Sequence, residues 1–325
     1  QYEKISTHWL ENIIDWNISR QIVWGIPIPA KICDKCDLGI VDLEDKEKQC
    51  KKCGGDLRKD NDTFDTWFSS GQWPYATLGY PDGKDFKDFY PTDVMETAGD
   101  IIFFWVSRMI MLGLYITGKV PFKTVYLHGV VLDAKGKKMS KSKGNVINPL
   151  DLTAKFGTDA FRMGMIVGNT PGASLSLSED KIKGYKHFAN KLWNITRFVL
   201  TSVEGEQYDK DFKDWSDLDK KMIEEFDLII KDVTSDMDNF RFYLASEKLY
   251  HYSWHQFADV ILEESKKVLK EGTVQEMKSR KQFLLHTLSK LLKTLHPFIP
   301  FVTEEIWKDM PVENKRMLII EDWPV

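Results

Sequence analysis

The sequence predicts an α/β region followed by an all-α helical bundle, with a small cysteine-rich insert inside the α/β part. A β-branched and aromatic segment at residues 124–132 follows an apolar run at 101–115, and strands that alternate with helices are typical of α/β folds. From about residue 181 the chain contains few Gly or Pro residues, which indicates long helices. A length of 325 residues fits about two domains plus the insert.

The composition is that of a folded globular protein. Hydrophobic residues make up 42% and charged residues 29% of the chain, which excludes wholesale disorder. Lys and Arg number 45 against 49 Asp and Glu, so the formal net charge is −4 and no global basic field indicates a nucleic-acid partner. A local RNA-binding face remains compatible with this balance, because such a face needs only a patch of positive charge.

The first 134 residues divide into three stretches of different character. Residues 1–30 end in an extended segment, because Pro27 and Pro29 are incompatible with a helix interior. Residues 31–62 are polar, rich in Lys and Asp, and contain all four cysteines. Residues 63–134 return to mixed apolar segments, in which the run at 101–115 predicts a buried helix and 124–132 a strand.

Several features bear on where the protein resides. The run from Ile101 to Leu114 is interrupted by Arg108 and is too short to span a bilayer, so we expect no membrane partner. The first twenty residues lack the basic-then-apolar pattern of a signal peptide. The chain starts with Gln within what looks like structured sequence, which predicts a trimmed or partial chain. Without signs of an oxidising compartment, the sequence predicts a cytoplasmic protein.

The C-terminal region carries the clearest helical pattern. Five leucines repeat at the spacing of one apolar stripe of an amphipathic helix: Leu284, Leu288, Leu291, Leu292 and Leu295. Pro297 and Pro300 predict the end of this helix, and Thr303 is expected to open another. The pattern predicts a helical bundle.

The four cysteines form two Cys-x2-Cys pairs, separated by 13 residues. This is the spacing of a zinc ribbon, in which Cys33, Cys36, Cys50 and Cys53 converge on one tetrahedral ion. Four thiolates leave no open coordination position, so the zinc is predicted to be structural and to replace a core in this polar insert. The alternative is four free cysteines in a polar loop.

A Lys-rich loop runs from Gly136 to Gly144 and contains Lys138-Met139-Ser140-Lys141-Ser142. Several ammonium groups on a Gly-flanked loop suit a polyphosphate whose charge shifts during reaction. By composition alone the loop could also be an ordinary solvated basic surface.

This pentapeptide, KMSKS in full, is one of the two signatures of class I aminoacyl-tRNA synthetases, and the chain resembles the Val/Ile/Leu subgroup of that family. The similarity extends over essentially the whole chain and is closest to the valine-specific members. It is carried by Asp15-Trp-x-Ile-Ser-Arg-Gln, Trp24-Gly, Thr63-Phe-Asp-Thr-Trp-Phe-Ser-Ser, Asp100-Ile-Ile-Phe-Phe-Trp-Val-Ser-Arg-Met, Gly157-Thr-Asp-Ala-Phe-Arg, Asn190-Lys-Leu-Trp-Asn and His296-Pro-Phe-Ile-Pro-Phe-Val-Thr-Glu-Glu-Ile-Trp.

The sequence also departs from the family pattern. The His-Ile-Gly-His signature is absent, and His128-Gly129 is only a faint echo of it. The editing insertion and the first half of the nucleotide-binding fold are missing too. The stretch from Gly25 to Lys31 resembles the isoleucine form. We therefore expect a fragment that is inactive, or nearly so, without the missing N-terminal part of the same enzyme.

The resemblance implies the second half of a Rossmann-like catalytic domain with a zinc-ribbon insert, followed by an anticodon-binding helical bundle. The expected limits are 1–30 and 63–150 for the catalytic part, 31–62 for the insert, 151–180 for a connecting stem-contact region and 181–325 for the bundle. The implied function is that of a valine–tRNA ligase, which activates valine with ATP and transfers it to tRNA. The alternatives are an isoleucyl-type fragment, a non-catalytic tRNA-binding module and a free-standing zinc-ribbon interaction protein.

The family also implies roles for individual residues. Lys141 is expected to be the main cation of the loop and to act with Lys138, Ser140 and Ser142, while Met139 and Gly129 help to bind ATP, with which Mg²⁺ is expected as a cosubstrate. Trp67 and Ile101 are expected to line the valine pocket, where ordinary core packing is the alternative. Asp100 is expected either to approach the substrate or to be a helix N-cap.

Three other pairs have weaker patterns. Asp159 and Arg162 predict a structural ion pair at a domain junction. His251 and His255 lie four apart and could bind a metal, but no third ligand is evident, so two polar-face histidines are the preferred interpretation. A further hypothesis is that Arg241 and Trp254 stack on anticodon bases, although aromatic residues in a bundle usually belong to the core.

Overall fold

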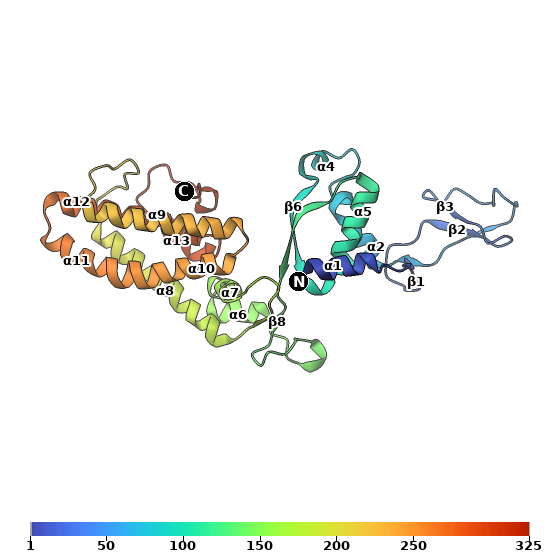
Figure 1. Ribbon diagram of the computed structural model, residues 1–325, viewed down its shortest axis with the longest axis horizontal. Coiled ribbons are helices and arrows are strands. Elements are labelled where there is room, and N and C mark those ends of the chain that lie inside the picture. Colours follow the sequence, from blue (N-terminus) through green and yellow to red (C-terminus); the bar gives the residue numbers. More distant parts are fainter. Residues whose placement is uncertain (1, 325) are drawn as a thin grey trace. The chain divides into compact units, whose positions relative to one another are not determined.

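The computed structural model describes residues 2–324, with the side chain of Lys141 outside the described part. The chain divides into two compact units, Gln1–His128 and Gly129–Val325. Figure 1 labels most of the helices and several of the strands.

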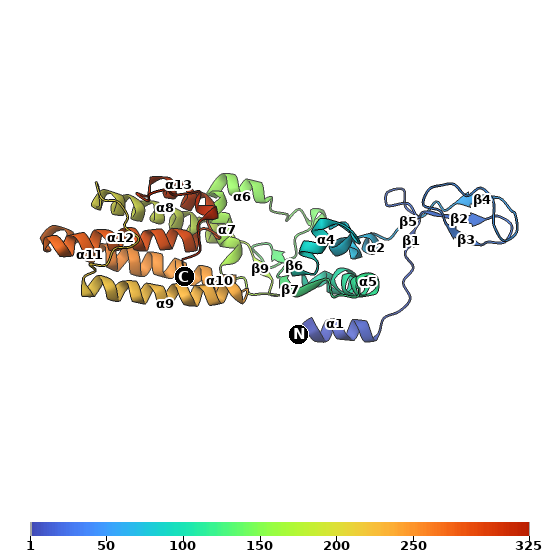
Figure 2. The same ribbon diagram turned by 90° about the horizontal axis from the view of Figure 1, so that it is seen from above.

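The first unit begins with a helix and a small antiparallel pair of strands. Helix α1 covers Tyr2–Glu11, and strand β1 (Ser19–Arg20) pairs with β5 (Thr63–Phe64). Between β1 and β5 the chain forms a separate three-stranded antiparallel sheet, in which β2 lies between β3 and β4, as Figure 2 shows. These strands are β2 (Ala30–Cys33), β3 (Gly39–Val41) and β4 (Leu57–Lys59).

A parallel strand pair with a helical crossover forms the rest of the first unit. Strand β6 (Thr92–Ala98) pairs in parallel with β7 (Phe122–His128). Parallel strands need a long connection, and here it is helical from residue 99 to residue 117. The connection consists of a 3-10 turn (Gly99–Ile101), a π-helix (Ile102–Ser107) and helix α5 (Arg108–Thr117). Helices α2 (Thr66–Gly71), α3 (Trp73–Ala76) and α4 (Lys84–Phe89) precede β6.

The apolar run at 101–115 is helical as predicted, but the expectation that it is buried is wrong for one of its faces. Val106 and Met109 are buried, whereas Phe104 is 44% and Tyr115 is 85% exposed. The reason is that the residues which cover this helix, Met95, Phe122 and Leu127 of the strand pair together with α1, α2 and α3, leave its other face open. Residues 99–117 are long and apolar enough to cross a membrane, with 33% of that window buried. One such helix is weak evidence for a span, because the core helix of a soluble domain has the same length and composition.

The second unit opens with two short parallel strands, β8 (Val131–Leu132) and β9 (Leu175–Ser176). Helices α6 (Pro149–Phe156) and α7 (Thr158–Ile166) lie between them in the sequence. The predicted strand at 124–132 is therefore broken after His128. The break coincides with Gly129, where a Cβ atom would lie 1.4 Å from the carbonyl oxygen of Ala173, so only glycine fits.

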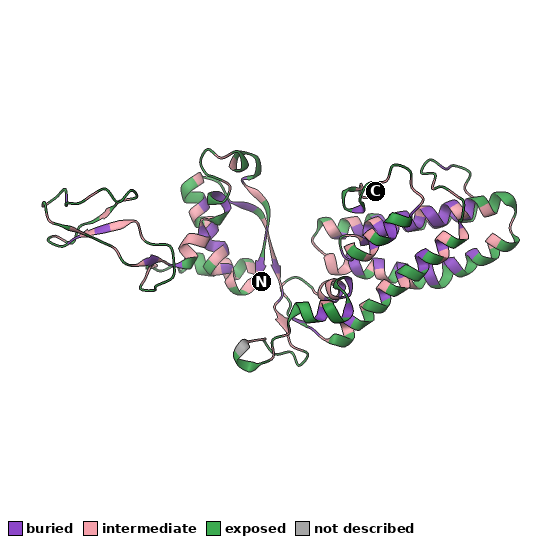
Figure 3. Ribbon diagram, turned by 180° about the vertical axis from the view of Figure 1, so that it is seen from behind, coloured by how far each residue is buried: buried purple, intermediate pink, exposed green. Residues whose placement is uncertain are grey.

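The helical bundle predicted from the leucine stripe is confirmed. All five of the stripe leucines are fully buried in α12, and Figure 3 shows burial along the inner faces of the neighbouring helices. Helix α12 ends at Leu295, as the prolines predicted, and α13 starts at Pro300, slightly before the expected position. The bundle consists of α8 (Glu179–Ser202), α9 (Asp217–Asp238), α10 (Phe242–His251), a π-helix (Tyr252–Ile261), α11 (Leu262–Glu271), α12 (Val274–Leu295) and α13 (Pro300–Asp309).

A fully buried ion pair joins two helices of the bundle. The Arg280 guanidinium donates to Asp219 at 2.5 Å, and both side chains are 1% exposed. Ser279 and Ser216 also donate to the Asp219 carboxylate, at 2.6 and 2.8 Å. A buried charge is tolerated only when its partners satisfy it, so this network fixes how α9 meets α12.

A half-buried histidine makes the bundle sensitive to pH. His286 is hydrogen-bonded through Nδ1 to the Tyr208 hydroxyl at 3.0 Å, and its Nε2 is buried without a partner. Burial, helped by the charge of Lys290, lowers the pKa of His286 to about 4. Because the folded state favours the neutral ring, stability is fully present above about pH 6.5 and is lost as the pH falls toward 4.

We expect the free energy of unfolding of the bundle to fall by about 2 kcal/mol between pH 6.5 and pH 5. Hydrogen exchange of the buried α12 amides measures it. His286→Gln should reduce this dependence and leave the part that comes from His296, whose pKa is also lowered by burial, whereas the same substitution at the exposed His187 should leave the dependence intact. An unchanged pH dependence in the His286 variant would show that another group is responsible.

Candidate functional site

The four cysteines come together as their spacing predicts. Their Sγ atoms all lie within 4.8 Å of one another, and the Cys33–Cys53 and Cys36–Cys50 sulfur distances are 3.5 and 3.7 Å. Ligands about 2.3 Å from a tetrahedral zinc ion are roughly 3.8 Å apart, so the donor set fits the metal. No disulfide links these cysteines.

Backbone N–H groups point at the sulfur atoms of the cluster, and the Lys35 N–H lies 3.4 Å from the sulfur of Cys33. The N–H groups of Lys52 and Cys53 lower the pKa of Cys50 to about 7. The Gly55 N–H acts in the same direction on Cys53, but the adjacent cysteine side chains outweigh it and raise the pKa of Cys53 to about 12. A Cβ atom at Gly55 would approach the sulfur of Cys33 to 3.1 Å, so glycine is needed beside the cluster. These features suit a closed, structural metal site.

Asp65 organises the segment that carries Trp67. Its carboxylate caps α2 by accepting the Trp67 backbone N–H at 2.9 Å, and it also accepts the Trp16 indole N–H at 3.0 Å. It forms an ion pair with Arg20 as well. Burial opposes ionisation of Asp65, but these partners outweigh it and lower the pKa of this carboxyl. Through these contacts Asp65 links the segment 15–21, which contains Trp16 and Arg20, to its own segment, 63–70.

The predicted valine-pocket residues lie close to this cluster in the first unit. Trp67 is half-buried and stacks on Phe104 with ring centroids 5.8 Å apart. Ile101 is half-buried at the end of the 3-10 turn. Asp100 is exposed within that turn, whose N-cap is Ala98, so the N-cap interpretation of Asp100 is wrong.

A cavity of about 580 Å³ adjoins the same aromatic residues. The Arg108 guanidinium lies in its wall, 3.5 Å from the centre of the Trp16 ring, and its buried Nη1 has no hydrogen-bond partner. Burial lowers the pKa of Arg108. Sequence reasoning did not single out Arg108 or Trp16, although both occur in the motifs that carried the resemblance. The cavity lining consists of Ile13, Ile14, Asp15, Trp16, Asn17, Arg20, Phe103, Phe104, Arg108 and Met111.

The Lys-rich loop belongs to the second unit, as does Gly129. Lys138 is exposed and Met139 is half-buried, while the Ser140 and Ser142 hydroxyls lie 3.2 Å apart. Lys141 begins a 3-10 turn (Lys141–Lys143), and its side chain lies outside the described residues. The loop therefore presents hydroxyl and ammonium groups on a tight, Gly-flanked backbone.

The expected ion pair between Asp159 and Arg162 does not occur among the described residues. The Asp159 carboxylate instead accepts the backbone N–H groups of Phe301 and Val302, at 3.2 and 2.7 Å. Arg162 donates to a carbonyl group of the preceding turn, that of Pro297, at 2.7 Å. Backbone N–H groups at the start of α13 bind Asp159, and carbonyl groups of the turn before α13 bind Arg162, so the two side chains attach α7 to α13 and the turn that precedes it.

The other predicted pairs show ordinary structural contacts. Arg241 forms an ion pair with Asp236 at 2.7 Å, and Trp254 packs against Phe188 in the bundle. The His251 and His255 rings lie 5.0 Å apart. Within residues 2–324, the cysteines form the one cluster whose geometry could hold a metal.

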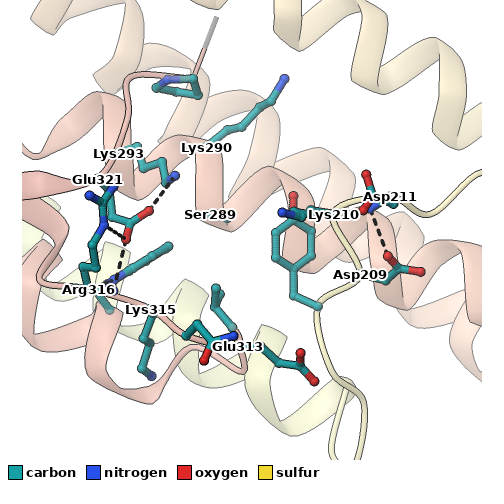
Figure 4. Close-up of a pocket in the computed structure, with 15 residues that line it drawn as sticks. Asp209, Lys210, Asp211, Ser289, Lys290, Lys293, Glu313, Lys315, Arg316 and Glu321 are labelled. Carbon is teal, nitrogen blue, oxygen red and sulfur yellow. Dashed lines mark hydrogen bonds and ion pairs between the residues drawn. The ribbon is translucent and has the colours of Figure 1, made fainter.

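The bundle contains a cavity of about 570 Å³ with many charged side chains around it (Figure 4). Glu321 lies between Lys293 and Arg316, at 3.3 and 3.5 Å, and Lys290 pairs with Asp227 at 2.6 Å. Three of the cations around the cavity, Lys290, Lys293 and Arg316, therefore already have acidic partners.

Comparison with known proteins gives consistent results along the chain. Residues 1–178 match the family model described as tRNA synthetases class I (I, L, M and V), and residues 219–325 match the anticodon-binding domain of tRNA ligase. Curated relatives named valine–tRNA ligase include those of Clostridium tetani (43% identical, 100% of this chain, 37% of that protein) and Dehalococcoides mccartyi (45%, 94% and 34%). The chain thus spans little more than a third of the length of these relatives.

Solved structures share the fold at low sequence identity. An Agrobacterium radiobacter LeuRS, in a ternary complex with tRNA and LeuAMS, gives a TM-score of 0.78 at 22% identity and covers 99% of this chain and 44% of that one. A Mycobacterium tuberculosis methionyl-tRNA synthetase with methionyl-adenylate gives 0.72 at 18% identity and covers 94% and 56%. At these identities the likeness concerns the fold alone.

Proposed function

Because the chain belongs to the family of class I tRNA synthetases (I, L, M and V), we propose that it is part of a valine–tRNA ligase, which activates valine with ATP and transfers it to tRNA. The chain has the class I catalytic-domain fold together with an anticodon-binding helical domain. The observation that carries the choice of valine is the match of 41–45% identity along nearly the whole chain to curated valine–tRNA ligases.

We infer that the Lys-rich loop binds ATP and stabilises the leaving pyrophosphate. The valine carboxylate attacks the α-phosphate and is already an anion, so this step needs no general base from the protein. Catalysis then depends on positioning and on charge stabilisation. Lys141 and Lys138 supply the positive charge, and Ser140 and Ser142 supply hydroxyl donors. Met139 and Gly129 complete the ATP contacts, and Mg²⁺ accompanies the nucleotide.

For the amino-acid pocket, we propose Trp67, Ile101 and Asp100. A flat indole and a branched aliphatic side chain suit a small branched substrate, and the stacking of Trp67 on Phe104 at 5.8 Å holds the indole in place. We assign Asp100 to the substrate side because it is exposed in the turn beside Ile101.

The family membership also supports a more specific description of the fold and of the metal site. We propose that the parallel pair β6–β7 with its helical crossover is part of a Rossmann-like domain, and that residues 31–62 form a zinc ribbon whose ion has a purely structural role. We also propose the domain limits expected from the sequence: 1–30 and 63–150 for the catalytic part, 31–62 for the insert, 151–180 for the connecting region and 181–325 for the bundle. We place the protein in the cytoplasm, since the cysteines are arranged for a metal and not for disulfides.

We assign the tRNA contact to the helical bundle, and we expect binding to weaken as the salt concentration rises. Neither Arg241 nor Trp254 is needed for this proposal, because each already has a partner within the bundle.

The test is ATP–pyrophosphate exchange by the full-length product of the gene that encodes this chain. We expect valine to support exchange at least about a hundredfold better than isoleucine, since one methylene in a tight apolar pocket discriminates to this degree. A preference for isoleucine would support the isoleucyl-type alternative. Salt-sensitive tRNA binding without exchange by either amino acid would support the non-catalytic tRNA-binding module.

A further inference from the structure

We propose that Asp133 and Asn145, which join the two ends of the Lys-rich loop, are positioning residues that hold its Ser140–Ser142 segment in the shape needed for the ATP-dependent step. The inference rests on the proposed ligase function and deepens it, because it adds two residues outside the pentapeptide. We refer to this pair of side chains as the loop clip.

Asp133 holds the first half of the loop. It directly follows β8, which pairs with β9, so its backbone is anchored. One carboxylate oxygen, Oδ1, accepts the backbone N–H groups of Lys135 and Lys137, both at 2.9 Å. The other oxygen, Oδ2, accepts the side-chain amide of Asn145 at 2.8 Å. Asp133 therefore closes the first turn and reaches across to the end of the loop.

Asn145 holds the second half. Its Oδ1 accepts the backbone N–H of Ser140 at 3.0 Å, and its Nδ2 contacts the carbonyl oxygen of Lys138 at 3.3 Å in addition to Asp133. The amide therefore links both ends of the loop to its centre. Every polar atom of the Asn145 side chain is used within the loop, so its role is to position the segment and not to contact substrate.

The charge pattern explains why the loop needs a clip. Residues 133–148 contain five lysines, and Asp133 is the one acidic residue among them. Like charges this close repel each other and favour an open loop. Hydrogen bonds from Asn145 and from the backbone of Lys137 lower the pKa of Asp133, so the carboxylate keeps its charge. The negative charge of Asp133 thus offsets part of the repulsion among the loop lysines. Without it, only a bound phosphate would supply negative charge to this loop.

Reciprocal substitutions test the pair. Asn145→Asp places two carboxylates against each other, and Asp133→Asn places two amide groups against each other. The double variant again pairs one amide with one carboxylate, with the two groups exchanged between positions 133 and 145. Only the 3.3 Å contact from the side-chain amide at position 145 to the carbonyl oxygen of Lys138 is lost. We expect each single variant of the full-length protein to form valyl-adenylate on the order of tenfold more slowly in a single turnover. The affinity for ATP should change less, and the double variant should recover most of the rate.

A matched control lies close by in the sequence. Asn148 donates to Asp151 at 3.1 Å at the start of α6, outside the loop, and the same reciprocal changes there should leave the rate unaltered. Limited trypsin digestion gives a readout that is independent of activity, because an opened loop exposes its lysines. The single variants should be cut faster between Lys135 and Lys143, and the double variant at the original rate.

The outcomes separate this inference from the proposed function. If the unchanged protein forms valyl-adenylate but the single variants keep their rates, or the double variant fails to recover, the loop clip is refuted and the ligase function stands. If the unchanged protein forms no valyl-adenylate, the proposed function fails, and the positioning role fails with it.

Discussion

Replacing Cys33 by Ser is expected to abolish tight zinc binding and to unfold the insert of residues 31–62. Structural zinc contributes about 10–16 kcal/mol to the folding of small cysteine-ligated domains, so no other single contact in the insert can compensate for its loss. The sulfur of Cys33 is one of four converging donors, and a hydroxyl group is a poor replacement for it as a zinc ligand.

The burial pattern makes this dependence strong. Within residues 31–62, only Lys31, Cys33 and Cys50 are buried, whereas Val41 and Leu43 are 76% and 80% exposed. Lys31 forms ion pairs with Asp42 and Asp45, both at 2.8 Å, which add polar contacts but no apolar core. An insert of this kind cannot bury enough apolar surface to fold alone.

The measurement combines zinc content with hydrogen exchange. The unchanged chain should contain one zinc ion, and its β2 amides should be protected until a chelator is added. Lys52→Ser alters an exposed side chain in the turn between the other two cysteines, Cys50 and Cys53, and keeps its backbone N–H, so it should preserve both properties. Full protection of β2 in the Cys33 variant, or in a metal-free unchanged chain, would contradict a structural metal site.

The features that the sequence predicted correctly are those set by short-range spacing. Two Cys-x2-Cys pairs converge because each pair turns its own sulfurs to one side. The leucines at 284–295 share a helix face because 3.6 residues complete a turn. The local spacing sets the shape of each pair and of the helix face, while the meeting of the two cysteine pairs also needs β2 to pair with β4, where Cys33 lies opposite Leu57.

The features that the sequence missed depend on residues far apart in the chain. Asp159 and Arg162 bind backbone groups more than 130 residues away, and no local pattern reveals such partners. The exposed outer face of the helix at 101–115 depends on how much of it the strands cover, whereas an apolar run by itself indicates burial. The loop clip was detectable in principle, because Asp133 is the one acid beside five lysines, but the contact to Asn145 requires the folded loop.

A second large effect is expected for Lys141→Ala in the full-length protein, where adenylate formation should slow at least a hundredfold. In the role proposed for this loop, an ammonium group at this position would meet negative charge that grows on the pyrophosphate in the transition state. Its loss therefore falls on the rate constant more than on the affinity for ATP. Removal of one such preorganised cation costs about 3–4 kcal/mol.

Lys135→Ala provides the matched control for this prediction. Lys135 is exposed in the same loop, and its only described contact is its backbone N–H to Asp133, which alanine retains. Its removal should change the rate little, since a solvated charge at this distance from the motif is screened by water and salt. Single-turnover formation of valyl-adenylate distinguishes the two variants. If both lysines gave the same small loss, the charge of Lys141 would have no special relation to the transition state, and the loop would be an ordinary basic surface.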